Sequence, residues 1–358
     1  MGCGASSSAH TNLSSVAADE LPLSEPPKRR ASVVSMEIEP SDLPREQLFR
    51  DEMPLFPGIK QHRIGTYSSH GMKPGGNGAA FAKINQDRGL ITYPFNDDPS
   101  MALFGVFDGH GANGEQVSDF VMWKVQELLL NNASQLRTSI ESCLIYAFEE
   151  ADRQLVTANV SAKVSGTAAV VCVMIGNTIW AANAGDSRAV LATRENDSPS
   201  SRVIVTPLTE DQKPDCPIEE ARILKSGGYV SKASPHFGPP RVWVRQGEGP
   251  GLAMARSIGD HVCKHVGVIA TPVVQRFEID PNKESRLLLA SDGVWELCAR
   301  PAHPLHVHAI NCATMWHATT CVPTWGFVGV LVAQYRERAG DGDCDGQSRC
   351  VRRMRCAH

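Results

Sequence analysis

Apolar residues recur every three or four positions in two central stretches of the chain, the spacing that places them on one face of a helix. The first stretch covers residues 114–130 and the second covers residues 140–155. A shorter stretch of the same kind, residues 217–226, ends at Gly227-Gly228, and glycine commonly follows the last turn of a helix. We therefore expect two long amphipathic helices and one short helix.

Short apolar runs of strand length surround these helices. Two of them flank Gly176-Asn177, which is a plausible tight hairpin turn. Strands joined by such short turns pair antiparallel. The pattern predicts an α+β fold in which helices cover antiparallel sheets. The strand candidates are residues 101–107, 168–175, 178–184, 188–193 and 286–291.

The composition is that of a globular protein. Of the 358 residues, 42% are hydrophobic and 21% are charged, which is enough apolar surface for a sizeable core. The formal net charge of −4 and the 6% aromatic content argue against nucleic acid as a partner. The eleven cysteines have no regular spacing, and no apolar run approaches the roughly 20 residues of a spanning helix. We expect a cytoplasmic monomer with reduced thiols.

The two ends of the chain differ from its middle. Residues 1–55 are rich in Ser, Ala, Pro and charge and predict a flexible tail, whereas residues 56–296 read as the globular domain. No lysine follows Lys283, while residues 297–358 hold six of the eleven cysteines and five of the twelve histidines. We interpret 297–358 as a divergent tail that is foreign to the domain before it. A shifted reading frame or an alternative terminal exon would explain it.

The first residues carry a possible lipidation signal. Gly2 followed by Ser6 fits the pattern for N-myristoylation, and Cys3 stands where a palmitoyl chain could be added. One myristoyl chain gives only marginal membrane binding, so stable attachment needs the second chain. We expect membrane association through these acyl chains. The alternative is a start rich in small residues that carries no lipid.

Four acidic turns provide the chemical signal. Asp108, Asp186 and Asp292 each follow a strand-like run and each have a glycine beside them, while Asp87 lies in a looser context. Each Asp-Gly alone is an ordinary turn. Several carboxylates converging without Cys or His would instead form an oxygen-only site, which favours Mg²⁺ or Mn²⁺ over Zn²⁺. Metals bound in this way support hydrolysis of phosphate esters.

These turns stand in motifs that resemble, in order, those of the protein phosphatase 2C family. The resemblance covers about residues 60–296. It implies a four-layer α/β/β/α sandwich of two antiparallel sheets flanked by helices. It also implies hydrolysis of phosphoserine and phosphothreonine in protein substrates by a metal-activated water at a binuclear Mn²⁺ or Mg²⁺ site. The motifs are residues 104–111 (FGVFDGHG), 184–188 (AGDSR), 208–214 (LTEDQKP), 255–260 (ARSIGD) and 290–295 (ASDGVW).

The same resemblance assigns roles to individual residues. Asp108 would bridge the two metals, and His110 would be the general acid that protonates the leaving oxygen. Lys83 is the cation nearest to the expected phosphate site, where the family has an arginine. The remaining metal ligands implied are Asp87 (mainly through water), Gly109 (through its carbonyl) and Asp292, with a weaker third site formed by Asp186, Asp292 and Glu296.

The chain also departs from the family pattern. Nothing in 297–358 matches the Asp-Asn or Asp-Asp motif that precedes the family's last strand, so one metal-binding aspartate is absent and we expect the C-terminal strand to be missing. Gln86 stands where many members have Glu. These departures leave two alternatives open. One is a catalytically impaired homologue that binds or sequesters phosphoproteins at a membrane, and the other is a chain that does not fold.

Three other patterns carry less weight. Cys216 and Arg222 have the Cys-x5-Arg spacing of cysteine-dependent phosphatases, but Glu219 and Glu220 between them oppose a thiolate. Residues 341–346 begin like a calcium loop yet have Arg352 where the bidentate glutamate is needed. The cysteines and histidines of the tail lack the paired spacing of zinc ligands.

Overall fold

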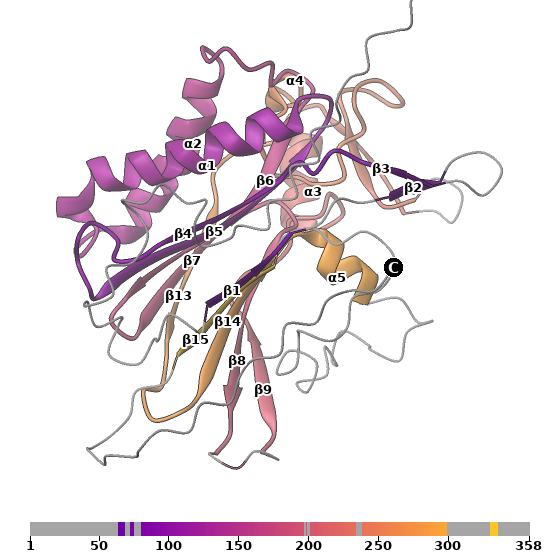
Figure 1. Cartoon of the computed structure of the whole chain (residues 1–358). Helices are drawn as coiled ribbons and strands as arrows, with labels where there is room; N and C mark the ends of the chain where they lie inside the picture. The colour runs from indigo at the N-terminus through magenta and orange to yellow at the C-terminus, as the bar shows by residue number, and fades with distance from the viewer. Residues whose placement is uncertain are drawn as a thin grey trace, which may run out of the picture. The chain divides into compact units, whose positions relative to one another are not determined.

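A computed structural model describes residues 64–68, 72–74, 80–196, 198, 201–233, 238–298 and 330–335. All of them belong to one compact unit, Met36–His358. Two antiparallel sheets lie face to face in this unit, and helices pack on their outer faces (Figure 1). The α+β sandwich expected from the sequence is confirmed.

The six-stranded sheet contains the expected hairpin at its centre. Its strand order is β13-β7-β6-β5-β4, and β12 pairs with β6 beside this path. β6 and β7 are joined through Gly176, whose φ of 56° explains the glycine at this turn. The strands are β4 (Asp87–Thr92), β5 (Met101–His110), β6 (Gly166–Ile175), β7 (Thr178–Ala184), β12 (Ile258–Gly259) and β13 (Val273–Glu278).

The central strands are apolar along most of their length because both of their faces are buried. On β6, Val171 and Val173 point into the core beneath the helices, while Val170 and Cys172 point into the core between the sheets. Successive side chains of a strand alternate between its faces. A strand covered on both sides therefore reads as a continuous apolar run.

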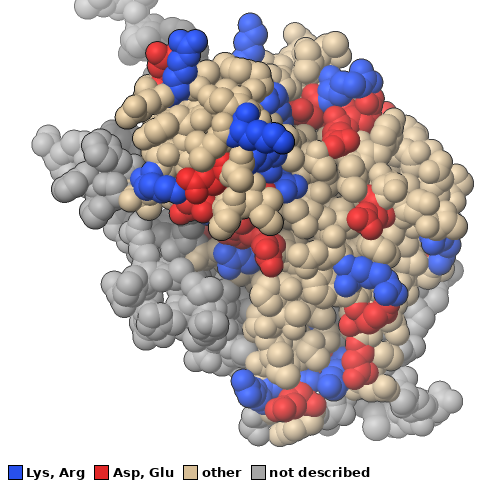
Figure 2. Space-filling view, turned by 180° about the vertical axis from the view of Figure 1, so that it is seen from behind, with Lys and Arg blue, Asp and Glu red and all other residues tan. Residues whose placement is uncertain are grey.

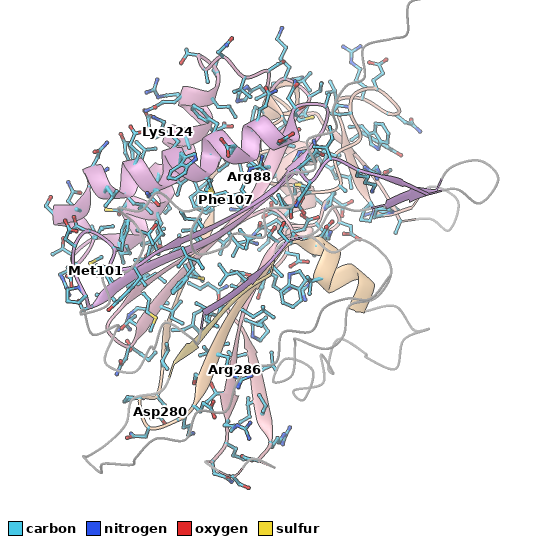
Figure 3. The ribbon with its side chains drawn as sticks, in the orientation of Figure 1. Arg88, Met101, Phe107, Lys124, Asp280 and Arg286 are labelled. Atoms are coloured by element: carbon cyan, nitrogen blue, oxygen red, sulfur yellow. The ribbon has the colours of Figure 1, made fainter. Side chains whose placement is uncertain are left out.

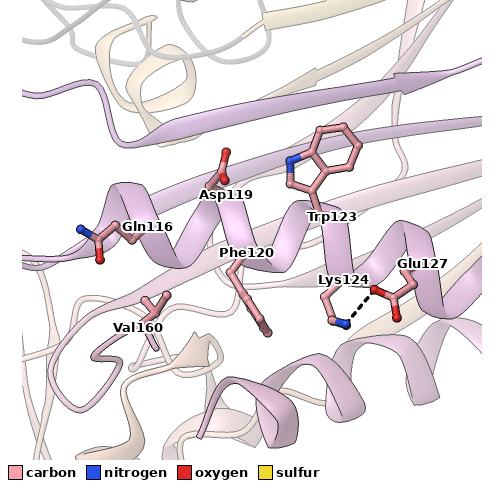
Figure 4. A pocket seen from close by; sticks show the side chains of 7 residues that line it. All are labelled: Gln116, Asp119, Phe120, Trp123, Lys124, Glu127 and Val160. Carbon is pink, nitrogen blue, oxygen red and sulfur yellow. Dashed lines mark hydrogen bonds and ion pairs between the residues drawn. The ribbon is translucent and has the colours of Figure 1, made fainter. Parts of the chain in front are cut away.

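Two long helices cover the six-stranded sheet (Figure 1). They are α1 (Gly114–Asn131) and α2 (Ile140–Leu155), which match the expected stretches, and the short 3-10 turn Ala133–Gln135 lies between them. Their buried faces carry the residues of the repeating pattern, as in Val121 and Leu144, which are fully buried. The outer face of α1 carries the exposed Trp123 and an ion pair of 2.7 Å between Lys124 and Glu127 (Figure 4).

The five-stranded sheet has the order β1-β15-β14-β8-β9. On β14, Leu287 and Leu289 face the core between the sheets, whereas Leu288 faces outward to a cluster with Trp295 of α5 (Asp292–Cys298). This helix therefore completes the fourth layer of the sandwich. The strands are β1 (Ile64–Tyr67), β8 (Arg188–Arg194), β9 (Val203–Pro207), β14 (Ser285–Ala290) and β15 (Val330–Tyr335).

One expectation about this sheet is wrong. We expected the C-terminal strand to be missing, but β15 lies between β14 and β1, with Leu331 opposite Leu289 and Ala333 opposite Ile64. The segment Val330–Tyr335 is rich in β-branched and aliphatic residues that suit a strand. Without it, β14 would have an unpaired edge. A segment with a foreign composition thus still supplies a strand of the sheet.

A smaller lobe packs against the end of the six-stranded sheet around a third apolar cluster. It contains α3 (Pro217–Lys225), β10 (Tyr229–Ser231), β11 (Arg241–Trp243) and α4 (His261–Lys264). The separate hairpin of β2 (Met72–Pro74) and β3 (Ala80–Ala82) precedes β4.

No helix in the described part of the chain is long and apolar enough to span a membrane. On the face shown in Figure 2, basic and acidic side chains are interspersed.

Candidate active site

The strand ends bring the acidic turns together. Asp87 is the first residue of β4 and pairs in register with Asp108 on β5. Asp186 follows β7, and Asp292 opens α5 directly after β14 of the other sheet. The four carboxylates come from segments as far apart as residues 87 and 292, and both sheets contribute to the cluster they form.

Three of these carboxylates are close enough to share an ion. One oxygen from each of Asp108, Asp186 and Asp292 lies within 4.8 Å of the others. The donor set contains oxygen alone, which is the preference of hard divalent cations such as Mg²⁺ and Mn²⁺. The Asp186 side chain is also held by Lys213, whose Nζ lies 2.7 Å from Oδ2.

Burial and mutual repulsion make the carboxyl groups of this cluster hard to ionise. Burial raises the pKa of Asp87 to about 7, and the neighbouring Asp292 carboxylate adds to the rise. Burial also raises the pKa of Asp108 well above its usual value, with further contributions from Asp87, Asp292 and Asp186. Like charges at this separation oppose one another's ionisation. A bound cation would relieve both effects.

Two buried oxygens of the cluster support the same conclusion. Asp87 Oδ2 and Asp186 Oδ1 have no hydrogen-bond partner among the described residues. A buried carboxylate oxygen without a donor is costly, and a metal ion is one of the partners that can satisfy it. The residues present therefore fit a divalent metal site.

Gly109 lies where no side chain can be accommodated. A Cβ at this position would lie 2.4 Å from the carbonyl oxygens of both Gln86 and Gly114. Gln86 also donates from Nε2 to the Gly111 carbonyl at 2.7 Å, a bond that an ionised glutamate at this position could not donate. The amide thus fastens the loop that follows β5.

His110 is held by a residue to which the sequence assigned no role. Its Nε2 lies 2.7 Å from Oδ2 of Asp260, which is 1% exposed. Burial alone would lower the pKa of the imidazole, but the Asp260 carboxylate outweighs it and raises the pKa. The sequence did indicate the motif 255–260, in which Asp260 is the last residue. The contact spans 150 residues and no local spacing reveals it.

The described part of the structure gives no contact with the carboxylates for the other residues singled out from the sequence. Lys83 is exposed between β3 and β4, and no hydrogen bond or ion pair in the described part of the chain joins it to the carboxylates. Glu296 lies on α5, but its side chain is outside what the structure describes. Gly2 and Cys3 also lie outside the described residues. Their roles stay predictions.

The Cys-x5-Arg pattern does not form a phosphate loop. Burial raises the pKa of the Cys216 thiol, and Asp215 and Glu219 add to the rise. Arg222 donates to the carbonyls of Gly267 and Ala255 at 2.8 and 2.7 Å, so its guanidinium is already engaged. The pattern is a coincidence of spacing.

Comparison with known proteins identifies the family of this chain. A profile of the protein phosphatase 2C family matches residues 76–301, well over half of the chain. The chain belongs to this family. The resemblance inferred from the motifs is thereby confirmed, and the family is one of serine/threonine protein phosphatases.

Relatives in plants and a solved parasite structure illustrate the match. The chain is 34% identical over 232 residues to "Probable protein phosphatase 2C 35" and 38% identical over 242 residues to "Probable protein phosphatase 2C 61", both from Arabidopsis thaliana. The alignments cover 60% and 64% of this chain, and 65% and 72% of those relatives. A serine-threonine phosphatase 2C from Toxoplasma gondii shares the fold, with a TM-score of 0.58 at 20% identity over 79% of this chain and 96% of that one.

Proposed function

We propose that this chain is a metal-dependent protein phosphatase that hydrolyses phosphoserine and phosphothreonine with two Mn²⁺ or Mg²⁺ ions. The observation that carries the proposal is the convergence of the Asp108, Asp186 and Asp292 oxygens within 4.8 Å in a phosphatase 2C fold. Raised carboxylate pKa values and orphaned oxygens in the same cluster support it.

In this proposal the carboxylates hold the ions and His110 handles the leaving group. Asp108, Asp292, the Gly109 carbonyl and, mainly through water, Asp87 would hold the main pair, while Asp186, Asp292 and Glu296 would form a weaker third site. The ions supply charge neutralisation and an activated water. His110 gives its proton to the serine or threonine oxygen as the P–O bond breaks, and Lys83 attracts the phosphate.

The test is release of inorganic phosphate from a phosphothreonine peptide in the presence of Mn²⁺. We expect Asp108→Ala to lower kcat by at least about 10²-fold, because the main metal site loses a shared ligand. Asp280→Asn is the control, since Asp280 is exposed in the turn before β14, at the opposite end of that strand from Asp292 (Figure 3). Equal rates for wild type and Asp108→Ala would rule the site out.

A second function is favoured by one feature of the sequence. Residues 299–329, which lead into β15, contain no aspartate or glutamate, so the usual final metal ligand of the family has no replacement there. The chain would then be an impaired homologue that binds or sequesters phosphoproteins at a membrane. Tight binding of the phosphothreonine peptide without turnover would support this function, and robust Mn²⁺-dependent turnover would exclude it.

Membrane attachment is proposed separately, from Gly2 and Cys3 alone. Two acyl chains would hold the chain at a bilayer, where one would not. The membrane-bound fraction in cell extracts should fall when Gly2→Ala blocks myristoylation. Cys3→Ser should weaken the attachment without abolishing acylation of Gly2. An unchanged fraction in both variants would contradict the proposal.

A further inference from the structure

The contact between His110 and Asp260 fixes which face of the imidazole is free. His110 and Asp108 are two residues apart on β5, so their side chains leave the same face of the strand. Nε2 of the ring is taken up by Asp260 at 2.7 Å. Nδ1 is buried next to the Asp108 backbone and makes no well-aligned hydrogen bond to a described residue. Nδ1 is therefore the nitrogen left to exchange a proton with a ligand.

Asp260 is itself held in place by further hydrogen bonds. Its Oδ2 accepts a second hydrogen bond from the Ser257 hydroxyl at 2.7 Å, and its backbone N–H donates to the Ser165 carbonyl at 2.9 Å. Its backbone is left-handed, with φ 50° and ψ 42°. A non-glycine residue keeps such a conformation only where its surroundings impose it, and these residues concentrate at functional sites.

The neighbouring strand leaves room for this pair and for nothing more. A Cβ on Gly166 of β6 would lie 2.2 Å from Asp260 Oδ2 and 2.8 Å from His110 Nε2. The absence of a side chain at Gly166 is thus a condition for the contact. Three segments, around residues 110, 166 and 260, meet at one hydrogen bond.

We propose that Asp260 is the positioning residue for the proposed general acid, holding a proton on Nε2 of His110 and aiming Nδ1 at the leaving oxygen. This inference rests on the proposed phosphatase function. Water attacks phosphorus, the P–O bond to serine or threonine breaks, and its electron pair goes to the leaving oxygen. That oxygen takes the Nδ1 proton, which leaves a neutral ring with its proton on Nε2. The attacking water gives one proton to solvent, and His110 recovers one.

The test compares two leaving groups in the full-length protein with Mn²⁺. A peptide alkoxide needs a proton, whereas p-nitrophenolate leaves without one. Asp260→Asn keeps the volume, and asparagine tolerates a left-handed backbone. We expect it to lower kcat for a phosphothreonine peptide by about 10- to 100-fold. The loss for p-nitrophenyl phosphate should stay under about threefold, and KM should change little for both substrates. Asp260→Asn combined with His110→Ala should be no slower than His110→Ala alone.

Asp152→Asn is the matched control. Asp152 accepts the backbone N–H of Gly259 at 2.7 Å and pairs with Lys264 at 3.2 Å, yet it does not touch His110. Its loss should affect both substrates by the same factor. Gly166→Ala gives an independent measurement, because it pushes the pair apart while leaving both residues present. It should repeat the selective loss on the peptide even if Asp260→Asn does not fold.

A readout without turnover comes from NMR of the metal-free protein labelled with ¹⁵N-histidine. We expect a protected imidazole N–H signal that is absent in His110→Ala, belongs to Nε2, and shifts or disappears in Asp260→Asn. A proton assigned to Nδ1 alone, or equal losses on both substrates in Asp260→Asn, would overturn the inference while the phosphatase proposal stood. A wild type inactive on both substrates would overturn the phosphatase function, and the role of Asp260 with it.

Discussion

Two buried acidic regions of this chain relate to their surroundings in opposite ways. Glu219 on α3 is 5% exposed and is paired at 2.6 Å with both Arg256 and Arg222. Burial alone would raise its pKa, but the two guanidinium groups hold the pKa of Glu219 below its usual value. At the carboxylate cluster, burial raises the pKa of Asp87 and Asp108, and their neighbours raise it further.

The difference shows what each region is for. The chain itself supplies the counter-charge for Glu219, so this ion pair contributes to the folded state as it stands. The cluster at Asp108 brings acidic side chains together with too few positive charges nearby to balance them. Selection for stability alone would remove such a cluster, whereas a binding function retains it. Opposite effects of charge removal at the two regions follow from this contrast.

The largest expected effect comes from removing the charge of Glu219, which is balanced by two arginines. Glu219→Gln leaves Arg256, whose side chain is 12% exposed, without its carboxylate partner. Losing one member of a buried ion pair costs about 3 kcal/mol of unfolding free energy. Thermal unfolding should show a Tm lowered by about 6–12 °C.

Glu220→Gln is the control for this change because it alters the next residue of the same helix. Glu220 pairs with Lys232, whose side chain is 66% exposed, and exposed pairs of this kind contribute at most about 1 kcal/mol. If Glu219→Gln and Glu220→Gln melted at the same temperature, Glu219 would not be stabilised in the way we describe.

A smaller effect of opposite sign is expected at the cluster. Asp108→Asn removes one of the mutually repelling carboxylates, so the metal-free protein should gain about 1–2 kcal/mol of unfolding free energy. Its Tm in chelator should rise by about 3–6 °C. Wild type should gain about 2.7 kcal/mol when Mn²⁺ is raised to 100 times its Kd, and the variant should lose most of this gain.

The control here is Asp280→Asn, an exposed acid outside the cluster, for which neither shift is expected. Calorimetry of Mn²⁺ binding to the same three proteins separates the two effects. A metal-free Asp108→Asn protein less stable than wild type would show that the carboxylates are satisfied without cations, and the contrast with Glu219 would be lost.

The sequence predicted the helices, the central strands and the acidic cluster because each has a local signature. Apolar residues recur every three or four positions on the buried face of α1, and β6 is largely a run of apolar residues. Asp186 and Asp292 each follow a strand, and Asp108 lies near the C-terminal end of β5. Local patterns of this kind are set by burial and turn chemistry. They identify a helix, a strand or the end of a strand, but they do not identify the distant segment with which it pairs.

What the sequence left out depends on pairing between distant segments. β15 was missed because the tail's unfamiliar composition hid a six-residue strand whose partners, β14 and β1, lie some 45 and 265 residues earlier. The contact of His110 with Asp260 and that of Glu219 with Arg256 likewise join residues far apart in the chain. Such contacts follow from topology, which no local spacing encodes.

The smallest expected effect concerns Asp98, whose pKa is lowered by its neighbours. It is measured as the dependence of the unfolding free energy on pH. The Ser100 hydroxyl lowers the pKa of Asp98 from 3.8 to about 2, with a contribution from Arg137. Because the folded pKa is depressed, this stabilisation is fully present above about pH 4 and is lost as the pH falls from 3.8 to about 2. Solvent screening keeps it under about 1 kcal/mol. The difference in unfolding free energy between wild type and Asp98→Asn should therefore be flat from pH 5 to 7 and shrink below pH 4, as measured by urea unfolding at each pH. A difference that grew toward acid pH would have the wrong sign for a carboxylate paired in the folded state.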